Sequence, residues 1–246
     1  MDAYPPLDTA DYASALDWWR DAGVDVLVED APRDWLATPI APPRPVVAPA
    51  AADAAPAGTA MPDTIEAFAG WRLGPDAPEA GWSGVSLAAS GPIDARVMVL
   101  VDCPEREDGD AGTLVSGAAG RLLDRMLAAV GLSRETVHLA AVCARRPASG
   151  RMPRDIEARL GEVARHHVGL VAPERLLLLG DATSRAVLSA ERPAVRGGLQ
   201  PFNHKRGQTG VVASLHPRLL LERPALKAES WRDLQLLVAG MEERKA

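Results

Sequence analysis

From about residue 92 onward, largely apolar stretches of strand length alternate with amphipathic stretches of helix length, and this alternation limits the folds open to the chain. The apolar runs occupy residues 96–101, 137–143 and 175–180, and a shorter one occupies 210–214. A strand that is apolar at nearly every position is buried on both faces, which is typical of parallel sheets. The pattern therefore predicts an α/β fold, a three-layer α/β/α sandwich with a central, mainly parallel sheet.

Helical stretches separate and follow these runs. Ser116 is placed to cap a helix over residues 117–130, and Asp181 is placed to cap the helix after the third strand. Further helices are expected over residues 155–171 and 224–241.

The first eighty residues have a different composition. Residues 8–28 show the spacing of a short amphipathic helix, and residues 39–62 are almost wholly Ala, Pro and Val, which is typical of a disordered or polyproline linker. A second short helix is expected over residues 64–71, with Asp63 as its cap. We divide the chain into a helical N-terminal segment (1–38), an Ala/Pro-rich linker (39–80) and a folded domain (81–246). The sequence identifies no partner for the N-terminal segment.

Length, charge and cysteine content narrow the class further. The 246 residues suffice for one α/β domain and an appendage. Cys103 and Cys143, the two cysteines, match no disulfide framework or metal-ligand spacing. No run of about eighteen apolar residues and no charged-then-apolar leader occurs. We therefore expect a soluble, cytoplasmic protein with no membrane span and no metal.

The net charge of −6 argues against a protein that coats nucleic acid through bulk electrostatics. Basic residues nevertheless gather locally in two clusters, Arg145, Arg146, Arg151 and Arg154 in the first and Arg196, Lys205, Arg206 and Arg218 in the second. Such charge runs are usually a solvated face, but they can also line a groove for a polyanion.

His216 is a candidate for a chemical role because of its position. It follows the strand-like stretch 210–214 and precedes Pro217, which cannot continue a strand ladder. The imidazole is therefore expected at the carboxyl ends of the strands, where open α/β sheets bind their ligands. Asp102, which follows the first strand, is a second candidate, and a solvated loop carboxylate is its alternative reading.

Taken in order, residues 92–241 resemble the uracil-DNA glycosylase superfamily, particularly its bacterial iron-sulfur family. The matching parts are residues 97–104, residues 112–131, Arg146-Pro147 with Arg151, the strand 176–180, Arg196-Gly197, and His216-Pro217 through Lys227, Trp231, Asp233 and Leu234. The resemblance implies an enzyme that flips a damaged nucleotide out of the DNA stack and cleaves its N-glycosidic bond.

That reaction passes through an oxocarbenium-like sugar and a departing base with negative charge, so the resemblance implies two catalytic groups. His216 is expected to donate to the base oxygen, and Asp102 stands where the family usually has glutamate, near the sugar and the attacking water. We assign DNA contacts to Ser116, Gly117, Gly120, Arg146, Arg151, Lys205, Arg206 and Arg218. The small residues at 116–120 equally suit a capped helix that packs closely on the sheet.

Several departures affect the base pocket, which the resemblance assigns to Cys103, Pro104, Val115 and Ala141. Val115 stands at the position of the family's stacking aromatic, and Ala141 stands at that of its base-reading asparagine. Glu105 replaces the glycine that lets backbone approach the ligand. Because a hydrogen-bonding site is what rejects the wrong base, we expect changed or lost base specificity.

The family's four cluster cysteines correspond to Gly70, Leu73, Arg145 and Arg159, and arginine cannot replace a thiolate ligand. We therefore expect no cofactor. Cys103 and Cys143 are interpreted as small core residues.

Two functions remain open. One is a DNA-binding, cluster-free glycosylase that acts on uracil or another deaminated base in DNA repair. The other is a catalytically inactive DNA-binding or scaffold homologue.

Overall fold

Five strands form one sheet in the order β2-β1-β3-β5-β4. The computed structural model describes Ser14 and residues 60–241, so the N-terminal helix expected over 8–28 and most of the predicted linker lie outside the described residues. The strands are β1 (Val97–Val101), β2 (Val137–Ala141), β3 (Arg175–Leu179), β4 (Gln200–His204) and β5 (Gly207–Ser214). Neighbouring strands run parallel except β4 and β5, which form an antiparallel hairpin.

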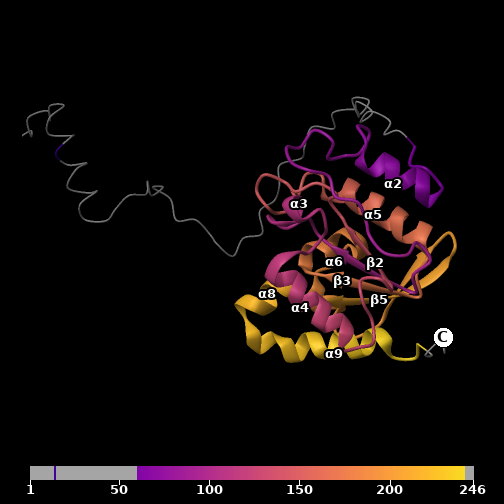
Figure 1. The fold of residues 1–246 in the computed structure, drawn as a ribbon, viewed down its shortest axis with the longest axis vertical. Helices are drawn as coiled ribbons and strands as arrows, with labels where there is room; N and C mark the ends of the chain where they lie inside the picture. Colours follow the sequence, from indigo (N-terminus) through magenta and orange to yellow (C-terminus); the bar gives the residue numbers. More distant parts are fainter. Residues whose placement is uncertain (1–13, 15–59, 242–246) are drawn as a thin grey trace, which may run out of the picture. The chain divides into compact units, whose positions relative to one another are not determined.

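Helices cover both faces of this sheet (Figure 1). They are α2 (Ile65–Leu73), α3 (Asp108–Ala111), α4 (Gly117–Ala128), α5 (Glu157–Val171), α6 (Asp181–Leu188), α7 (Arg192–Val195), α8 (Pro217–Glu222) and α9 (Lys227–Val238). Val99 of β1 packs in an apolar core with α4 and α9, whereas Met98 packs in a second core with α5 and α6. Successive side chains of a strand point to opposite faces, so β1 supplies both cores. The predicted α/β/α sandwich with a mainly parallel sheet is confirmed.

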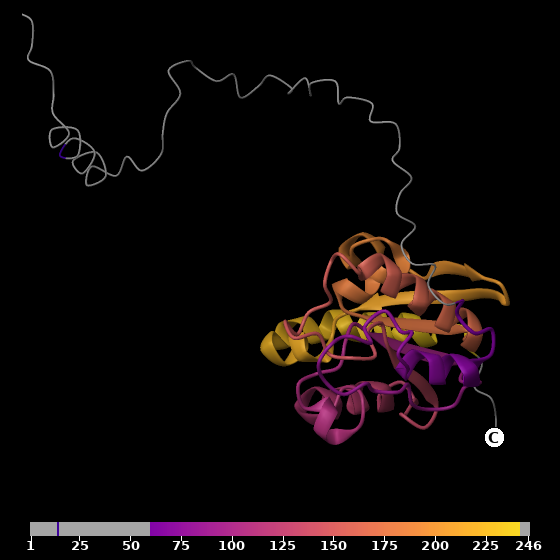
Figure 2. The same cartoon turned by 90° about the horizontal axis from the view of Figure 1, so that it is seen from above.

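The parallel register brings the carboxyl ends of the three central strands to one edge of the sheet. Val101 pairs with Leu179, and Leu179 pairs with Ser214. The turn between β4 and β5 lies at the opposite end of β5, and at the usual rise of a strand this eight-residue element separates the two ends by about 23 Å. Figure 2 shows the β4–β5 hairpin and the first helix after β5 at opposite ends of the sheet.

The folded part of the chain begins before residue 81, the boundary expected from composition. Helix α2 lies inside the predicted linker and packs on α5 through Phe68, which is 1% exposed and contacts Val163 and Leu170. The side chain of Thr64, rather than that of Asp63, caps α2 by accepting a hydrogen bond from the Ala67 amide. One buried aromatic side chain thus anchors a stretch whose Ala/Pro-rich surroundings suggested a linker.

The end of the chain also differs from the prediction. The residues after His216 form α8, which was not expected, and the helix expected over 224–241 is a 3₁₀ turn (Pro224–Leu226) followed by α9. Strand β4 was not expected either, because its exposed and half-buried residues alternate at the sheet edge. Within the described residues, no helix combines the length and apolarity needed to cross a membrane.

Candidate active site

A cleft of about 360 Å³ opens at the sheet edge where β1, β3 and β5 end. Asp102, Gly180 and His216 reach it from the segments that follow these three strands. Three arginines that had been assigned to DNA binding also line it, namely Arg146, Arg151 and Arg218. Five residues predicted from separate parts of the sequence therefore meet in one cleft, at the edge where parallel sheets place their ligands.

His216 is held by the start of α8. It is the N-cap of this helix, with Pro217 in the first helical position, and its Nδ1 accepts a hydrogen bond of 3.2 Å from the Arg218 amide. Burial lowers the pKa of His216 to about 4, and the residue is 5% exposed. At neutral pH the ring is therefore neutral, with its hydrogen on Nε2. This buried Nε2 has no hydrogen-bond partner among the described residues.

Asp102 supplies a carboxyl group from the end of β1, which lies on the other side of β3 from β5 and His216. Its backbone oxygen accepts a hydrogen bond of 2.8 Å from the Cys143 amide, which ties the loop after β1 to the loop after β2. Burial raises the pKa of Asp102, while its own backbone surroundings and the charges of Arg218 and Arg146 oppose the rise. The carboxylate is thus a stronger base than one in free solution.

Glu105 joins these groups, although sequence analysis had treated it only as a departure from the family's glycine. Its two carboxylate oxygens accept hydrogen bonds of 2.8 and 2.9 Å from Nη1 of Arg218. One oxygen lies 3.7 Å from Nδ1 of His216, and the other lies 4.0 Å from Nη1 of Arg146. Because the 3.7 Å separation exceeds a hydrogen bond, Nδ1 keeps the Arg218 amide as its donor. The charge of Glu105 raises the pKa of His216, but burial lowers it by more.

Asp108 is a second residue that sequence analysis missed, and it organises the loop between β1 and α4. Its fully buried carboxylate accepts hydrogen bonds of 2.6 to 2.8 Å from the Glu105, Val115 and Ser116 amides and from the Ser116 hydroxyl. Ser116 therefore occupies the N-cap position of α4 without capping it through its side chain, contrary to the prediction. Val115 is held at a φ of 50°, a rare value for a β-branched residue.

The four residues assigned to the base pocket do not line the cleft together. Cys103, Pro104 and Val115 are buried in the protein interior, whereas Ala141 lines a separate, mostly apolar pocket beside α2. Burial raises the pKa of the Cys103 thiol to about 12 and also raises that of the Cys143 thiol. Both cysteines are thus buried free thiols.

The remaining residues assigned to DNA contact have other surroundings. A side chain at Gly120 would collide with the Val115 carbonyl, so its small size lets α4 approach the preceding loop. Gly117 adopts a φ of 60° beside the Glu107 carboxylate. Lys205 and Arg206 belong to the β4–β5 turn, at the far end of β5 from the cleft, and Arg206 donates to the Leu170 carbonyl. The structure therefore does not bring these four residues into the cleft.

The profile of the Uracil DNA glycosylase superfamily matches residues 88–235, which is more than half of the chain. The chain belongs to this superfamily. The Type-4 uracil-DNA glycosylase of Pyrobaculum aerophilum is 28% identical over 163 residues, which are 63% of this chain and 83% of the relative. The Type-4 enzymes of Archaeoglobus fulgidus and Thermotoga maritima are each 27% identical, over 57% and 55% of this chain and 74% and 71% of the relatives. The resemblance inferred from the sequence is confirmed.

The superfamily's iron-sulfur branch raises the question whether the residues here fit a cluster. Arg145, at one of the four ligand positions, donates hydrogen bonds of 2.6, 2.7 and 3.0 Å to the Ala80 carbonyl, the Trp82 carbonyl and the Ser86 hydroxyl. A guanidinium is a donor and cannot ligate iron. In residues 60–241, no three or more His, Cys, Asp or Glu side chains gather as metal ligands. The residues present do not fit a cluster.

A buried ion pair near these positions joins α2 to the loop after β2. Arg72 pairs with Glu79 and donates a hydrogen bond of 2.5 Å to the Val142 carbonyl, and Glu79 accepts one of 2.7 Å from the Ala144 amide. In this member of the superfamily, charged side chains and backbone groups therefore hold together segments near the expected cluster positions.

Proposed function

We propose that this chain is a DNA glycosylase that hydrolyses the N-glycosidic bond of uracil or another deaminated base. The observation that carries the proposal is the neutral, buried imidazole of His216, which shares the cleft with Asp102. Its Nε2 hydrogen has no partner within residues 60–241. A buried donor without an acceptor costs free energy in the free protein. A ligand oxygen in the cleft would remove that cost.

His216 acts on the departing base in this proposal. Cleavage leaves the bonding electrons on the base, so negative charge grows on its carbonyl oxygen in the transition state. A donor fixed in a buried site stabilises such charge without reorganising during the reaction. The Arg218 amide, which donates to Nδ1, keeps the hydrogen of the neutral ring on Nε2. The imidazole therefore acts as a neutral hydrogen-bond donor rather than as an acid.

Asp102 acts on the sugar side. Its carboxylate can orient the water that attacks the anomeric carbon, accept a proton from that water and stabilise the cationic sugar. The raised pKa of Asp102 favours proton acceptance. Because the group must be ionised to act, the rate should fall as the pH drops through the raised pKa of Asp102.

DNA binding is proposed for the basic rim of the same cleft. Arg151 and Arg146 come from the loop after β2, and Arg218 comes from α8. Guanidinium groups on two sides of a cleft suit the phosphates that flank a flipped nucleotide. Arg218 is bound to Glu105 in the free protein, so a phosphate must compete with that carboxylate for it.

A non-catalytic DNA-binding homologue is the second candidate, and the composition of the base pocket favours it. Val115 is buried and Ala141 faces another pocket, so neither supplies the stacking and paired hydrogen bonds expected for a uracil reader. This homologue would keep the arginine rim and lose base release.

Abasic-site formation on defined oligonucleotides separates the two candidates. The substrates carry one uracil, hypoxanthine or xanthine in single-stranded or double-stranded DNA, and the wild-type chain is incubated with each in excess over DNA. The glycosylase proposal expects abasic sites with at least one base. His216→Ala, purified in the same way, controls for a contaminating glycosylase.

Binding of the same oligonucleotides is measured in parallel. DNA binding without abasic sites on any substrate would contradict the glycosylase and favour the non-catalytic homologue. Equal abasic-site formation by the wild type and by His216→Ala would assign the activity to a contaminant or to other residues.

A further inference from the structure

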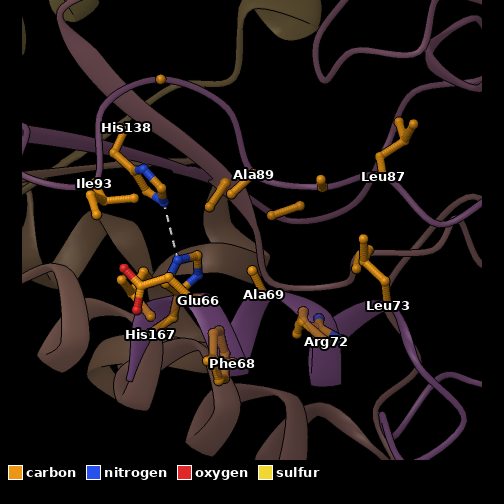
Figure 3. Close-up of a pocket in the computed structure, with 16 residues that line it drawn as sticks. Glu66, Phe68, Ala69, Arg72, Leu73, Leu87, Ala89, Ile93, His138 and His167 are labelled. Carbon is orange, nitrogen blue, oxygen red and sulfur yellow. Dashed lines mark hydrogen bonds between the residues drawn. The ribbon is translucent and has the colours of Figure 1, made fainter. Parts of the chain in front are cut away.

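A second cavity, of about 270 Å³, lies between α2, the segment that precedes β1, and β2 (Figure 3). Its walls are mainly apolar and include Phe68, Ala69, Leu73, Leu87, Ala89 and Ile93. Two histidines, His138 of β2 and His167 of α5, form its polar end. The proposed glycosylase chemistry uses none of these residues.

The hydrogen bonds of the two histidines fix which nitrogens carry hydrogen. Nδ1 of His138 lies 3.1 Å from the Pro92 carbonyl oxygen, which can only accept, so this nitrogen is the donor. Nε2 of the same neutral ring is then an acceptor. Nε2 of His167 lies 3.1 Å from it and must donate. Burial lowers the pKa of both rings, that of His167 to about 3, which keeps both neutral at pH 7.

Within the histidine pair, this chain of donors leaves one acceptor, Nδ1 of His167. The exposed residue Glu66 of α2 also lines the pocket. His167 is 6% exposed, and its Nδ1 makes no hydrogen bond within residues 60–241. Figure 3 shows it turned toward the space beside Ala69 and Ala89. Because His167 lines the cavity, a ligand with a hydrogen-bond donor can reach this free acceptor from the cavity.

We propose that this pocket binds a small, flat, mainly apolar molecule that carries one hydrogen-bond donor, of the size of an indole. A cavity of roughly 150 Å³ holds a benzene ring, so the larger volume here suits two fused rings. The apolar walls take the rings, and Nδ1 of His167 takes the donor. Arg72, which also lines the pocket, is committed to Glu79 and to the Val142 carbonyl.

The same features disfavour a nucleobase in this pocket. A nucleobase carries several carbonyl or ring acceptors, and the two histidines offer them no donor, because both ring N–H groups are already donated. The cavity is therefore a site separate from the cleft, with a different ligand class.

Titration of the full-length protein with indole and with 1-methylindole tests the proposal by calorimetry. Both molecules have similar apolar surface, but only indole carries a donor. We expect one saturable site for indole and affinity for 1-methylindole weaker by about fivefold, the usual scale of one hydrogen bond. Absence of indole binding, or equal affinity for the two molecules, would overturn the proposal.

A pair of variants on α2 locates the site. Ala69 lines the pocket and Ala67 does not, yet both are exposed residues of the same helix. Ala69→Leu should narrow the pocket and weaken indole binding at least fivefold, whereas Ala67→Leu should leave it unchanged. Abasic-site formation should be the same in both variants. Indole binding that Ala69→Leu does not weaken would place the ligand elsewhere and refute the assignment.

Discussion

The two buried histidine sites of this protein present opposite groups to their surroundings. In the cleft, His216 carries an Nε2 donor that has no partner in the part of the chain that the structure describes. Beside α2, His167 turns an Nδ1 acceptor toward an apolar cavity. Burial makes both rings neutral at pH 7, so charge does not distinguish them. The difference comes from the backbone group that each site contacts. The Arg218 amide donates to His216, whereas the Pro92 carbonyl accepts from His138, which in turn accepts from His167.

Local backbone geometry therefore decides what a buried imidazole can recognise. A donor suits negative charge that develops on a departing base, whereas an acceptor suits a neutral ligand with an N–H or O–H group. The Pro217 step places the Arg218 amide against Nδ1 of His216, so one short sequence feature sets the polarity of the cleft.

The largest expected effect is loss of stability in acid, because both sites contribute to it. The pKa values of His216 and His167 fall from about 6.5 in the unfolded chain to about 4 and about 3 in the folded protein. Their contribution is fully present above pH 6.5 and is lost as the pH falls toward these values. For His216 alone the loss approaches about 3 kcal/mol near pH 4. The raised pKa of Asp102 acts in the opposite direction, because protonating this buried carboxylate as the pH falls stabilises the folded protein.

Urea unfolding at pH 7, 6, 5 and 4 measures this effect. His216→Gln should make the free energy of unfolding depend less steeply on pH. A wild-type protein as stable at pH 4.5 as at pH 7 would show that the rings are not held neutral by burial.

The second effect concerns the cleft alone. His216→Ala should lower the single-turnover rate of abasic-site formation by about a hundredfold or more, the usual scale for loss of a donor to developing charge. DNA affinity should change little, because phosphate contacts dominate binding. His204→Ala, in the hairpin at the far end of β5, should retain the wild-type rate. An unchanged rate in His216→Ala would remove this residue from the mechanism.

A smaller change is expected for Asp102→Asn, which keeps the shape of the side chain. The rate should fall by about tenfold or more, because the amide cannot take a proton from water. The free energy of unfolding at pH 7 should rise, because a buried carboxylate whose pKa is raised costs folding free energy when ionised. Asp155→Asn, at an exposed carboxylate away from the cleft, should change neither quantity. A variant that is both active and no more stable would contradict this role.

The smallest effect separates the cleft rim from the hairpin. Arg151→Ala and Arg146→Ala should each weaken DNA binding and reduce the slope of log affinity against log salt by about one. Lys205→Ala should do neither, since the hairpin lies at the opposite end of the sheet. Equal slopes for Arg151→Ala and the wild type would make the rim a solvated face, and a reduced slope for Lys205→Ala would extend the DNA surface to the hairpin.

Sequence patterns predicted those strands of the sheet whose residues are buried. The apolar runs that form β1 and β3 are buried from end to end, so their composition reveals them. Strand β4 lacks this signal, because it lies at the edge and contains Pro201. The helix at α2 was predicted but was placed in the linker, because its anchors, the buried Phe68 and the Arg72–Glu79 ion pair, leave no periodic apolar signal.

The candidate site was predicted only in part, for a similar reason. Asp102 and His216 follow strands that a sequence pattern can locate, so their meeting at one edge follows from the parallel topology. Asp108 and Glu105 act through backbone amides and an arginine from a distant segment, and such contacts leave no periodic signal. The charge of Lys205 suggested DNA contact, but charge does not say at which end of a strand a residue lies.

Nitrogen-15 NMR of the histidine rings in the full-length protein shows which ring nitrogens carry hydrogen. At pH 7 we expect His216 to be neutral, with hydrogen on Nε2 and none on Nδ1. We also expect hydrogen on Nδ1 of His138 and on Nε2 of His167. A His216 ring that is doubly protonated at pH 7, or that carries its hydrogen on Nδ1, would contradict the claim that the cleft offers a neutral donor to the departing base.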